Sequence, residues 1–186
     1  MTTNSEAQKL TFHELVEENF RDHNKLSTRQ DVTVGISVTF KNNEGTDVEA
    51  HMTITYLGNV ASDIYEPHEQ ALIEFQSIAR TLKSSTGHKL TVIRHDKFGP
   101  KSDIPVLLVK PDEQAEKLFI NFHQKYGQCE PNMSSKLIVP IFHVSLKFND
   151  LAFARDLSVG TEIEFHSMFM KRLGNCPPFF IESINL

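Results

Sequence analysis

One short sequence pattern occurs twice in this chain of 186 residues. Residues 51–56 read HMTITY and residues 143–148 read HVSLKF. Each copy begins with His, has Thr or Ser at its third position and an aromatic at its sixth, and places apolar residues second and fourth. Polar and apolar positions alternate, and β-branched and aromatic residues are frequent, so each copy predicts a β-strand. Any fold for this chain must accommodate two strands of the same chemistry.

Side chains of a strand alternate between its two faces, so each copy divides into a polar set and an apolar set. The polar sets carry an imidazole with a hydroxyl two residues further on, and the apolar sets are suited to burial. The polar sets are His51, Thr53, Thr55 and His143, Ser145, Lys147; the apolar sets are Met52, Ile54, Tyr56 and Val144, Leu146, Phe148. Two such strands facing each other would form a cleft with two histidines and two hydroxyls.

The strength of this signal comes from the length of the shared pattern. The chain has nine His residues, so a single His-x-Thr/Ser would be expected by chance, and none of the other seven histidines shows one. Two copies that also share three further positions are much less common. The alternative interpretation is two ordinary half-buried strands, each with a histidine on its solvent side.

The amino-acid composition is typical of a folded protein and indicates its cellular compartment. Apolar residues make up 39% of the chain, which is compatible with one core. No apolar run is long enough for a membrane span, and residues 1–9 are polar with no signal-peptide core. The only two cysteines, Cys129 and Cys176, are expected to be free thiols, and no Cys-x-x-Cys suggests zinc. We therefore expect a cytoplasmic protein that needs no membrane partner.

The charge balance favours small ligands over long nucleic acids. The formal net charge is -5, whereas proteins that bind long duplexes without sequence preference usually have a strongly basic face. A single phosphate needs only one or two local cations. The one basic stretch, residues 94–101, is either a solvated loop or such a local site.

The periodicity along the chain predicts an ordered series of elements. Alternating segments indicate strands, and spacings of three and four between apolar residues indicate helices. Pro67 and Pro111 each suit a helix start, and Gly87 and Gly127 suit helix ends. The predicted strands are residues 32–40, 48–57, 89–98, 104–110, 137–148, 161–171 and 179–185, and the predicted helices are residues 6–25, 67–84 and 112–126.

The order of these elements predicts an α+β fold. After the first helix, each half of the chain has a motif strand and a helix among antiparallel strands. We therefore expect one domain over residues 31–186 with two similar lobes, each a mainly antiparallel sheet backed by a helix, and a central cleft across which the motif strands face each other. We expect residues 1–30 to form an N-terminal extension with a helix and residues 1–8 to be disordered.

This arrangement of motifs resembles the 2H phosphoesterase superfamily. That group includes bacterial RNA ligase-like proteins, cyclic nucleotide phosphodiesterases and viral enzymes that destroy nucleotide signals of host immunity. The first copy, continued by Leu57 and Gly58, looks like the family's first motif and its turn, and residues 142–146 look like the second. Phe98-Gly99 resembles the aromatic position before the middle hairpin. The likeness covers residues 32–186.

The resemblance implies a set of site residues and no metal or other cofactor. His51 and His143 would be the catalytic pair, and Thr53 and Ser145 would hold the phosphate. We add three candidate substrate contacts, of which Lys147 is outside the family motif and follows from our own strand assignment. Lys147 would lie on the cleft side and neutralise a phosphate oxygen. Phe98 or Tyr56 would stack on a base, although the alternation assigns Tyr56 to the core.

These residue types suit hydrolysis of a phosphodiester without a metal. One histidine takes a proton from water, the other gives a proton to the leaving oxygen, and the hydroxyls hold the phosphate as charge develops. Attack and departure take place on opposite sides of phosphorus, so acid and base should flank it. The sequence does not assign the two roles to one histidine each.

The expected substrate is a small nucleotide or an RNA end. Three kinds fit: a 2′,3′-cyclic phosphate, a 2′–5′ oligonucleotide, and a cyclic oligonucleotide messenger. The compact chain resembles stand-alone phosphodiesterases, viral ones included. A viral enzyme of this kind would act in the host cytoplasm and degrade immune nucleotide signals. We expect a monomer without long duplex partners.

Two alternatives remain. The first is a metal hydrolase. His13-Glu14 and His68-Glu69 each match the start of the zinc-binding motif His-Glu-x-x-His but lack its second histidine. The second is a nucleotide- or RNA-binding module of the same fold that does not turn over.

Overall fold

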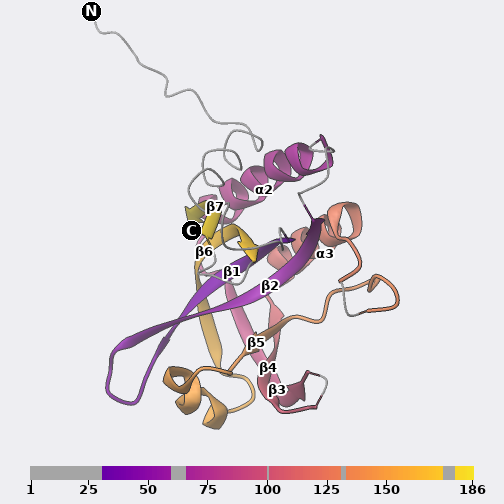
Figure 1. Ribbon diagram of the computed structural model, residues 1–186. Coiled ribbons are helices and arrows are strands. Elements are labelled where there is room, and N and C mark those ends of the chain that lie inside the picture. The colour runs from indigo at the N-terminus through magenta and orange to yellow at the C-terminus, as the bar shows by residue number, and fades with distance from the viewer. Residues whose placement is uncertain (1–30, 60–65, 100, 131–132, 174–178) are drawn as a thin grey trace, which may run out of the picture.

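The structure is a computed structural model that describes residues 31–59, 66–99, 101–130, 133–173 and 179–186. Antiparallel strands and three helical segments make up these residues, which confirms the α+β class (Figure 1). The elements are β1 Asp31–Lys41, β2 Asp47–Asn59, α2 Glu66–Ser84, β3 Lys89–Phe98, β4 Ile104–Pro111, α3 Glu113–Tyr126, β5 His143–Ser145, the 3-10 helix η1 Asn149–Asp156, β6 Glu162–Leu173 and β7 Phe179–Asn185. The predicted N-terminal extension at residues 1–30 and Cys176 lie outside the described residues.

The strands form one continuous antiparallel sheet that closes on itself. Its order is β1-β2-β5-β4-β3-β6-β7, and β1 also pairs with β6. The pairing of β1 with β6 joins six strands into a barrel-like ring, and β7 extends the sheet beyond β6. As a result, the two motif strands, β2 and β5, are neighbours inside one sheet.

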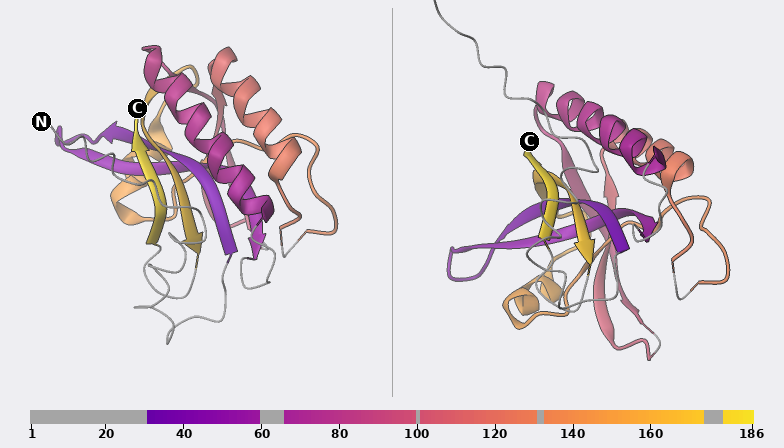
Figure 2. Two further views of the ribbon diagram at one scale, coloured as in Figure 1. Left: turned by 90° about the horizontal axis from the view of Figure 1, so that it is seen from above. Right: turned by 45° about the horizontal axis from the view of Figure 1, so that its top comes forward.

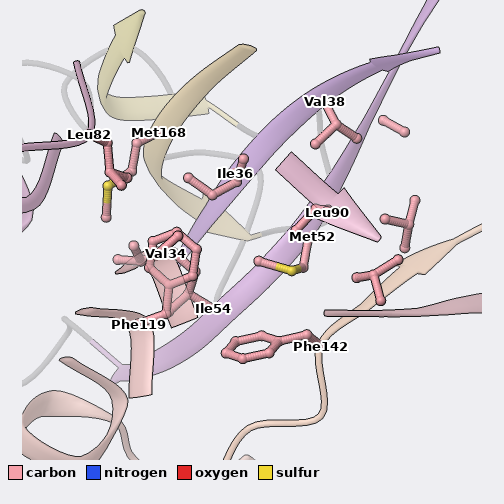
Figure 3. Close-up of a cluster of buried hydrophobic side chains, with 14 of the residues drawn as sticks. Val34, Ile36, Val38, Met52, Ile54, Leu82, Leu90, Phe119, Phe142 and Met168 are labelled. Carbon is pink, nitrogen blue, oxygen red and sulfur yellow. The ribbon is translucent and has the colours of Figure 1, made fainter. Parts of the chain in front are cut away.

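The core lies between one face of this sheet and the two long helices. Both helices lie on the same side of the strands, as the two views in Figure 2 show. In β1 every second residue from Val32 to Val38 is completely buried, as the period-two pattern predicts. Phe119 from α3 packs against Val34 and Ile54 on this face (Figure 3). The other face of the same strands is thereby left for the polar side chains.

The start of α3 is fixed by one carboxylate. Asp112 is the residue before the helix, and its side chain accepts a hydrogen bond from the Ala115 amide at 3.2 Å. The same carboxylate accepts bonds from the His88 ring at 3.0 Å and from the Lys89 amide at 3.2 Å. Such a cap satisfies a helix amide that has no partner within the helix. Pro111, expected at the helix start, instead ends β4.

The prediction of a long strand over residues 137–148 is wrong. Only His143–Ser145 forms a strand, and the chain before it is irregular. Pro140 has no amide hydrogen to give to a sheet ladder, which excludes a regular strand there. Ile138 is 80% exposed, and Val139 and Ile141 are about half exposed. The sequence prediction also missed η1, which follows this segment directly.

The other predicted elements between residues 31 and 186 occur within a few residues of their predicted bounds. In this described part of the chain, none of the helices has both the length and the apolar character needed to cross a membrane.

Candidate active site

The two motif strands are joined at one residue pair. Met52 in β2 is the antiparallel partner of Val144 in β5. In an antiparallel pair, one step forward along one strand corresponds to one step backward along the other. His51 therefore lies opposite Ser145, and Thr53 lies opposite His143. The two copies are therefore related by a local two-fold axis through the Met52–Val144 pair. The motif strands lie side by side, which corrects the expectation that they face each other across a cleft.

This register gathers the four motif side chains on one face. Met52 and Val144 are completely buried on the core face, while His51, Thr53, His143 and Ser145 are partly exposed on the other. Directly opposed residues have Cβ atoms about 5 Å apart, and diagonal residues such as the two histidines about 7–8 Å. Each imidazole thus stands beside a hydroxyl of the other copy.

The alternation in β2 does not continue through the whole first copy. The pairing with β1 shifts twice, and Ile54 and Leu57 have no partner in that strand. Such bulges change the face of the residues that follow. Thr55 was expected beside His51 but is 3% exposed and is hydrogen-bonded to the His123 ring at 2.8 Å. Tyr56, which the alternation assigned to the core, lines a surface cavity with Thr53.

His51 has a buried cation as its neighbour. The Lys171 ammonium on β6 lies 3.5 Å from His51 Nε2 and 4.6 Å from the centre of the Phe169 ring. The His51 and Phe169 rings meet edge to face, with centroids 5.7 Å apart. Burial, followed by the charges of Lys171 and His143, lowers the pKa of His51 to about 4. The imidazole is therefore neutral at pH 7.

A glycine makes room for this arrangement. Gly35 in β1 is the partner both of Thr53 in β2 and of Phe169 in β6. A Cβ atom on Gly35 would stand 2.5 Å from the Phe169 ring and 2.5 Å from the Met52 carbonyl oxygen. Because no side chain occupies this position, the Phe169 ring lies over Gly35 and reaches His51.

His143 has different neighbours. Its Nδ1 lies 2.8 Å from the Ile141 carbonyl oxygen. A carbonyl only accepts, so Nδ1 carries a hydrogen and Nε2 is the atom available for chemistry. The Phe98 ring from the end of β3 contacts the imidazole edge to face, with centroids 4.8 Å apart. The predicted aromatic of the middle hairpin is thus placed directly at the second motif.

A cavity of about 210 Å³ opens beside His143 and Thr53. Its wall is mainly apolar, and Gln128, Glu130 and Lys136 add polar groups. Phe98 and Tyr56, two of the three added candidate contacts, line it. The third, Lys147, is exposed two residues beyond the end of β5 and does not line this cavity. The cation at the site is Lys171 instead.

A histidine that sequence reasoning did not select holds one wall of the cavity. His123 of α3 is buried, and its Nε2 donates to the Leu137 carbonyl oxygen at 2.7 Å. Its Nδ1 then accepts from the Thr55 hydroxyl at 2.8 Å. Gly127 lets the chain pass close by, since a Cβ atom there would stand 2.5 Å from the Thr55 oxygen. His123 therefore connects β2, α3 and the loop before β5.

Lys171 was also missed, although the sequence contains a weak signal for it. Residues 167–171 read SMFMK, in which Met168 and Met170 belong to the core face and Lys171 alternates with them. A lysine in this register points to the polar face. What the sequence lacks is the pairing of β6 with β1, which brings that face to the first motif.

The donor set does not resemble a metal centre. Within the part of the chain that the structure describes, no three side chains of His, Cys, Asp or Glu are grouped for metal binding. His68, one of the zinc-motif candidates, is buried and contacts the Leu57 carbonyl oxygen through Nε2 at 3.1 Å. Two imidazoles with two hydroxyls and an ammonium instead provide groups that transfer protons and bind an anion.

Neither a scan against models of known protein families nor a search of curated proteins gave a match to this chain.

Proposed function

We propose that this protein is a metal-independent phosphodiesterase that hydrolyses a phosphodiester of a small nucleotide or an RNA end with its two motif histidines. The observation that carries the proposal is the register of β2 and β5, which sets each histidine opposite the hydroxyl of the other copy. This register supports the proposal because it brings two imidazoles and two hydroxyls to one face, where they could act on a single phosphate.

The proposed fold is that of a two-lobed 2H phosphoesterase. In this assignment β1, β2 and β6 belong to one lobe and β3, β4 and β5 to the other, with the motif strands at the junction. The pairing order supports it, since each set is contiguous in the ring and the sets meet at β2–β5 and at β3–β6.

The chemistry uses the four motif residues. One imidazole takes a proton from a water molecule, whose oxygen attacks phosphorus. The bond between phosphorus and the leaving oxygen breaks, and the other imidazole gives its proton to that oxygen. The Thr53 and Ser145 hydroxyls donate to the non-bridging oxygens as negative charge increases on them. Each histidine contributes on the order of 100- to 10,000-fold to the rate.

The cavity beside His143 supports a nucleoside substrate. It opens directly from the position between Thr53 and His143, and the Phe98 and Tyr56 rings in its wall offer stacking surfaces. A nucleoside on one side of the scissile phosphate would occupy it. The substrates that fit are a 2′,3′-cyclic phosphate, a 2′–5′ oligonucleotide or a cyclic oligonucleotide, including the immune messengers that viral enzymes of this kind degrade.

A product assay in excess EDTA tests this proposal. The panel contains 2′,3′-cyclic mononucleotides, 2′–5′ oligoadenylate and cyclic dinucleotides, and products are separated by chromatography. The variants are His51→Ala and His143→Ala, and His166→Ala is the matched control, because His166 is exposed on β6.

We expect cleavage of at least one panel member in EDTA, loss of product in both motif variants, and full activity in the control. Binding of a panel member without product would instead favour the non-catalytic binding module. Cleavage that EDTA abolishes would contradict the metal-free mechanism.

A further inference from the structure

Lys171 is a buried lysine at the candidate active site. It is 7% exposed, and its ammonium lies between the His51 imidazole and the face of the Phe169 ring. Burial of an ammonium is costly unless the charge is compensated. Among the described residues, Lys171 forms no ion pair with a carboxylate. The cation–π contact with Phe169 offsets only part of that cost.

The charges around Lys171 and His51 are few. Lys171 on β6 and His143 on β5 face His51, and Glu49 on β2 faces Lys171. Burial lowers the pKa of Lys171, and the Glu49 carboxylate opposes that change. One ammonium and two imidazoles thus converge on one position, which favours an anion there.

A second polar group at this place also lacks a partner. Thr33 in β1 is the direct partner of Lys171 in β6, so the two side chains lie on the same face. Thr33 is 5% exposed, and its hydroxyl oxygen has no hydrogen-bond partner within the described residues. Buried hydroxyls are nearly always hydrogen-bonded. The unpaired hydroxyl beside a buried ammonium is consistent with a bound anion.

We propose that Lys171 binds a non-bridging oxygen of the phosphate and that its charge makes His51 the general base and His143 the general acid. This inference rests on the proposed function and names the roles within it. A cation beside His51 disfavours the imidazolium form, so His51 enters the reaction neutral and can accept a proton from water. His143 Nε2 supplies the proton for the leaving oxygen.

The geometry suits a contact that is released when substrate binds. The distance of 3.5 Å between Lys171 Nζ and His51 Nε2 is at the long end for a hydrogen bond. A phosphate oxygen is a stronger acceptor for an ammonium than a neutral imidazole is. The ammonium therefore turns toward the phosphate, which frees the Nε2 lone pair of His51 for the attacking water.

The test compares Lys171→Met and Lys171→Arg with Lys110→Met, a matched control at an exposed lysine of β4. The imidazole signals are followed by NMR over a pH titration, and His51→Ala assigns the His51 signal. Inorganic phosphate is then titrated as the probe ligand. Neither readout needs turnover, so both remain informative if no panel member is cleaved.

In Lys171→Met we expect the His51 pKa to rise above its value of about 4, while burial still holds it below 6.5, and phosphate affinity to fall about 10- to 100-fold. The Arg variant should retain most of the phosphate affinity, and the control should match wild type. Since Met has a similar shape and no charge to bury, the melting temperature of Lys171→Met should stay equal or rise.

If a panel member is cleaved, the acidic limb of the pH profile of kcat/KM should move to higher pH in Lys171→Met, because the His51 base is then easier to protonate. An unchanged His51 titration together with unchanged phosphate affinity would overturn the role of Lys171, whether or not the protein cleaves a substrate. A lowered melting temperature with both readouts unchanged would show a purely structural lysine. Expected NMR and phosphate results without any cleavage would overturn the proposed enzyme and retain the anion site.

Discussion

The two copies of the motif share a sequence pattern and differ in almost everything around it. His51 lies in the middle of a strand of 13 residues, whereas His143 begins a strand of only three. Both imidazoles meet an aromatic ring edge to face, but a buried ammonium adjoins His51, while a backbone carbonyl and an open cavity adjoin His143. The pattern sets the spacing and the face of each imidazole, and the neighbouring strands set its protonation and its access to ligand.

The aromatic position of the pattern differs as well. Tyr56 is 9% exposed and lines the cavity, whereas Phe148 is 63% exposed and precedes η1. An approximate two-fold relation in sequence has therefore become an asymmetric site, with the charged groups on one side and the cavity on the other. Variants at the shared and at the differing positions of the two copies measure how far the symmetry and the asymmetry extend.

Loss of either imidazole should have the largest effect. His51→Ala and His143→Ala should each lower kcat/KM by about 100- to 10,000-fold, because each removes one proton transfer. The melting temperatures should remain close to that of wild type, since both side chains are partly exposed. Steady-state kinetics on the cleaved panel member measures this, and His166→Ala should behave as wild type. Full activity in either motif variant would refute the claim that both motif histidines take part in catalysis.

The two hydroxyls should have smaller and similar effects. Thr53→Val and Ser145→Ala should each lower kcat/KM by roughly 10- to 100-fold, the loss expected for one hydrogen bond to a charged group. The local two-fold axis predicts comparable losses in the two variants. Parallel kinetic measurements would test this, and a loss confined to one hydroxyl would mean that only one copy holds the phosphate.

Acid should destabilise the protein through His51. Its imidazole is protonated below pH 6.5 in the unfolded chain but only below about 4 in the folded protein. Stability attributable to this group is therefore complete above pH 6.5 and decreases as pH falls toward 4, by up to about 3 kcal/mol. His51→Gln should remove this part of the pH dependence while matching wild type at pH 8. Urea unfolding at several pH values provides the measurement, and an identical pH dependence in both proteins would contradict the environment described for His51.

The wall of the cavity should depend on the Thr55–His123 contact. Thr55→Val removes the donor to a buried ring nitrogen, which should cost about 1–3 kcal/mol of unfolding free energy. KM should rise more than kcat falls, because the loop at Leu137 is no longer held through His123. Chemical denaturation and kinetics measure the two effects. Thr39→Val, on the neighbouring strand, is the control, and equal stability of the two variants would argue against this role for His123.

The smallest effect is expected at the ring beside His143. Phe98→Leu should raise KM about threefold to tenfold and leave kcat nearly unchanged, since an edge-to-face contact contributes about 0.5–1.5 kcal/mol. Phe148→Leu is the matched control on the exposed aromatic of the second copy. If kcat fell and KM did not change, Phe98 would position His143 for catalysis and would not bind the substrate.

Most of the elements could be predicted from the sequence because their patterns are local. Every second residue of β1 is apolar, and the structure buries all of these from Val32 to Val38. The core faces of the two long helices follow their spacing in the same way. The exception is the segment before β5, where apolar residues suggested a strand that Pro140 and the lack of a covering layer do not allow.

The parts that could not be predicted depend on pairing between distant segments. The bulge at Ile54 reverses the expected faces of Thr55 and Tyr56, and no residue type in β2 predicts it. Closure of the ring by β1 and β6 joins residues more than a hundred positions apart and brings Lys171 to His51. The sequence therefore predicted the four motif residues, and tertiary structure added the cation and the cavity.

The most direct test of the central claim is a double-variant cycle on the cleaved panel member in EDTA. Rates are compared for wild type, His51→Ala, His143→Ala and the variant that carries both changes. If the two imidazoles act together on one phosphate, the double variant will be about as slow as either single one, because groups that act as a unit are not additive. If the losses of the two single variants instead multiply in the double variant, or if either single variant keeps its activity, the two motifs do not form one catalytic site.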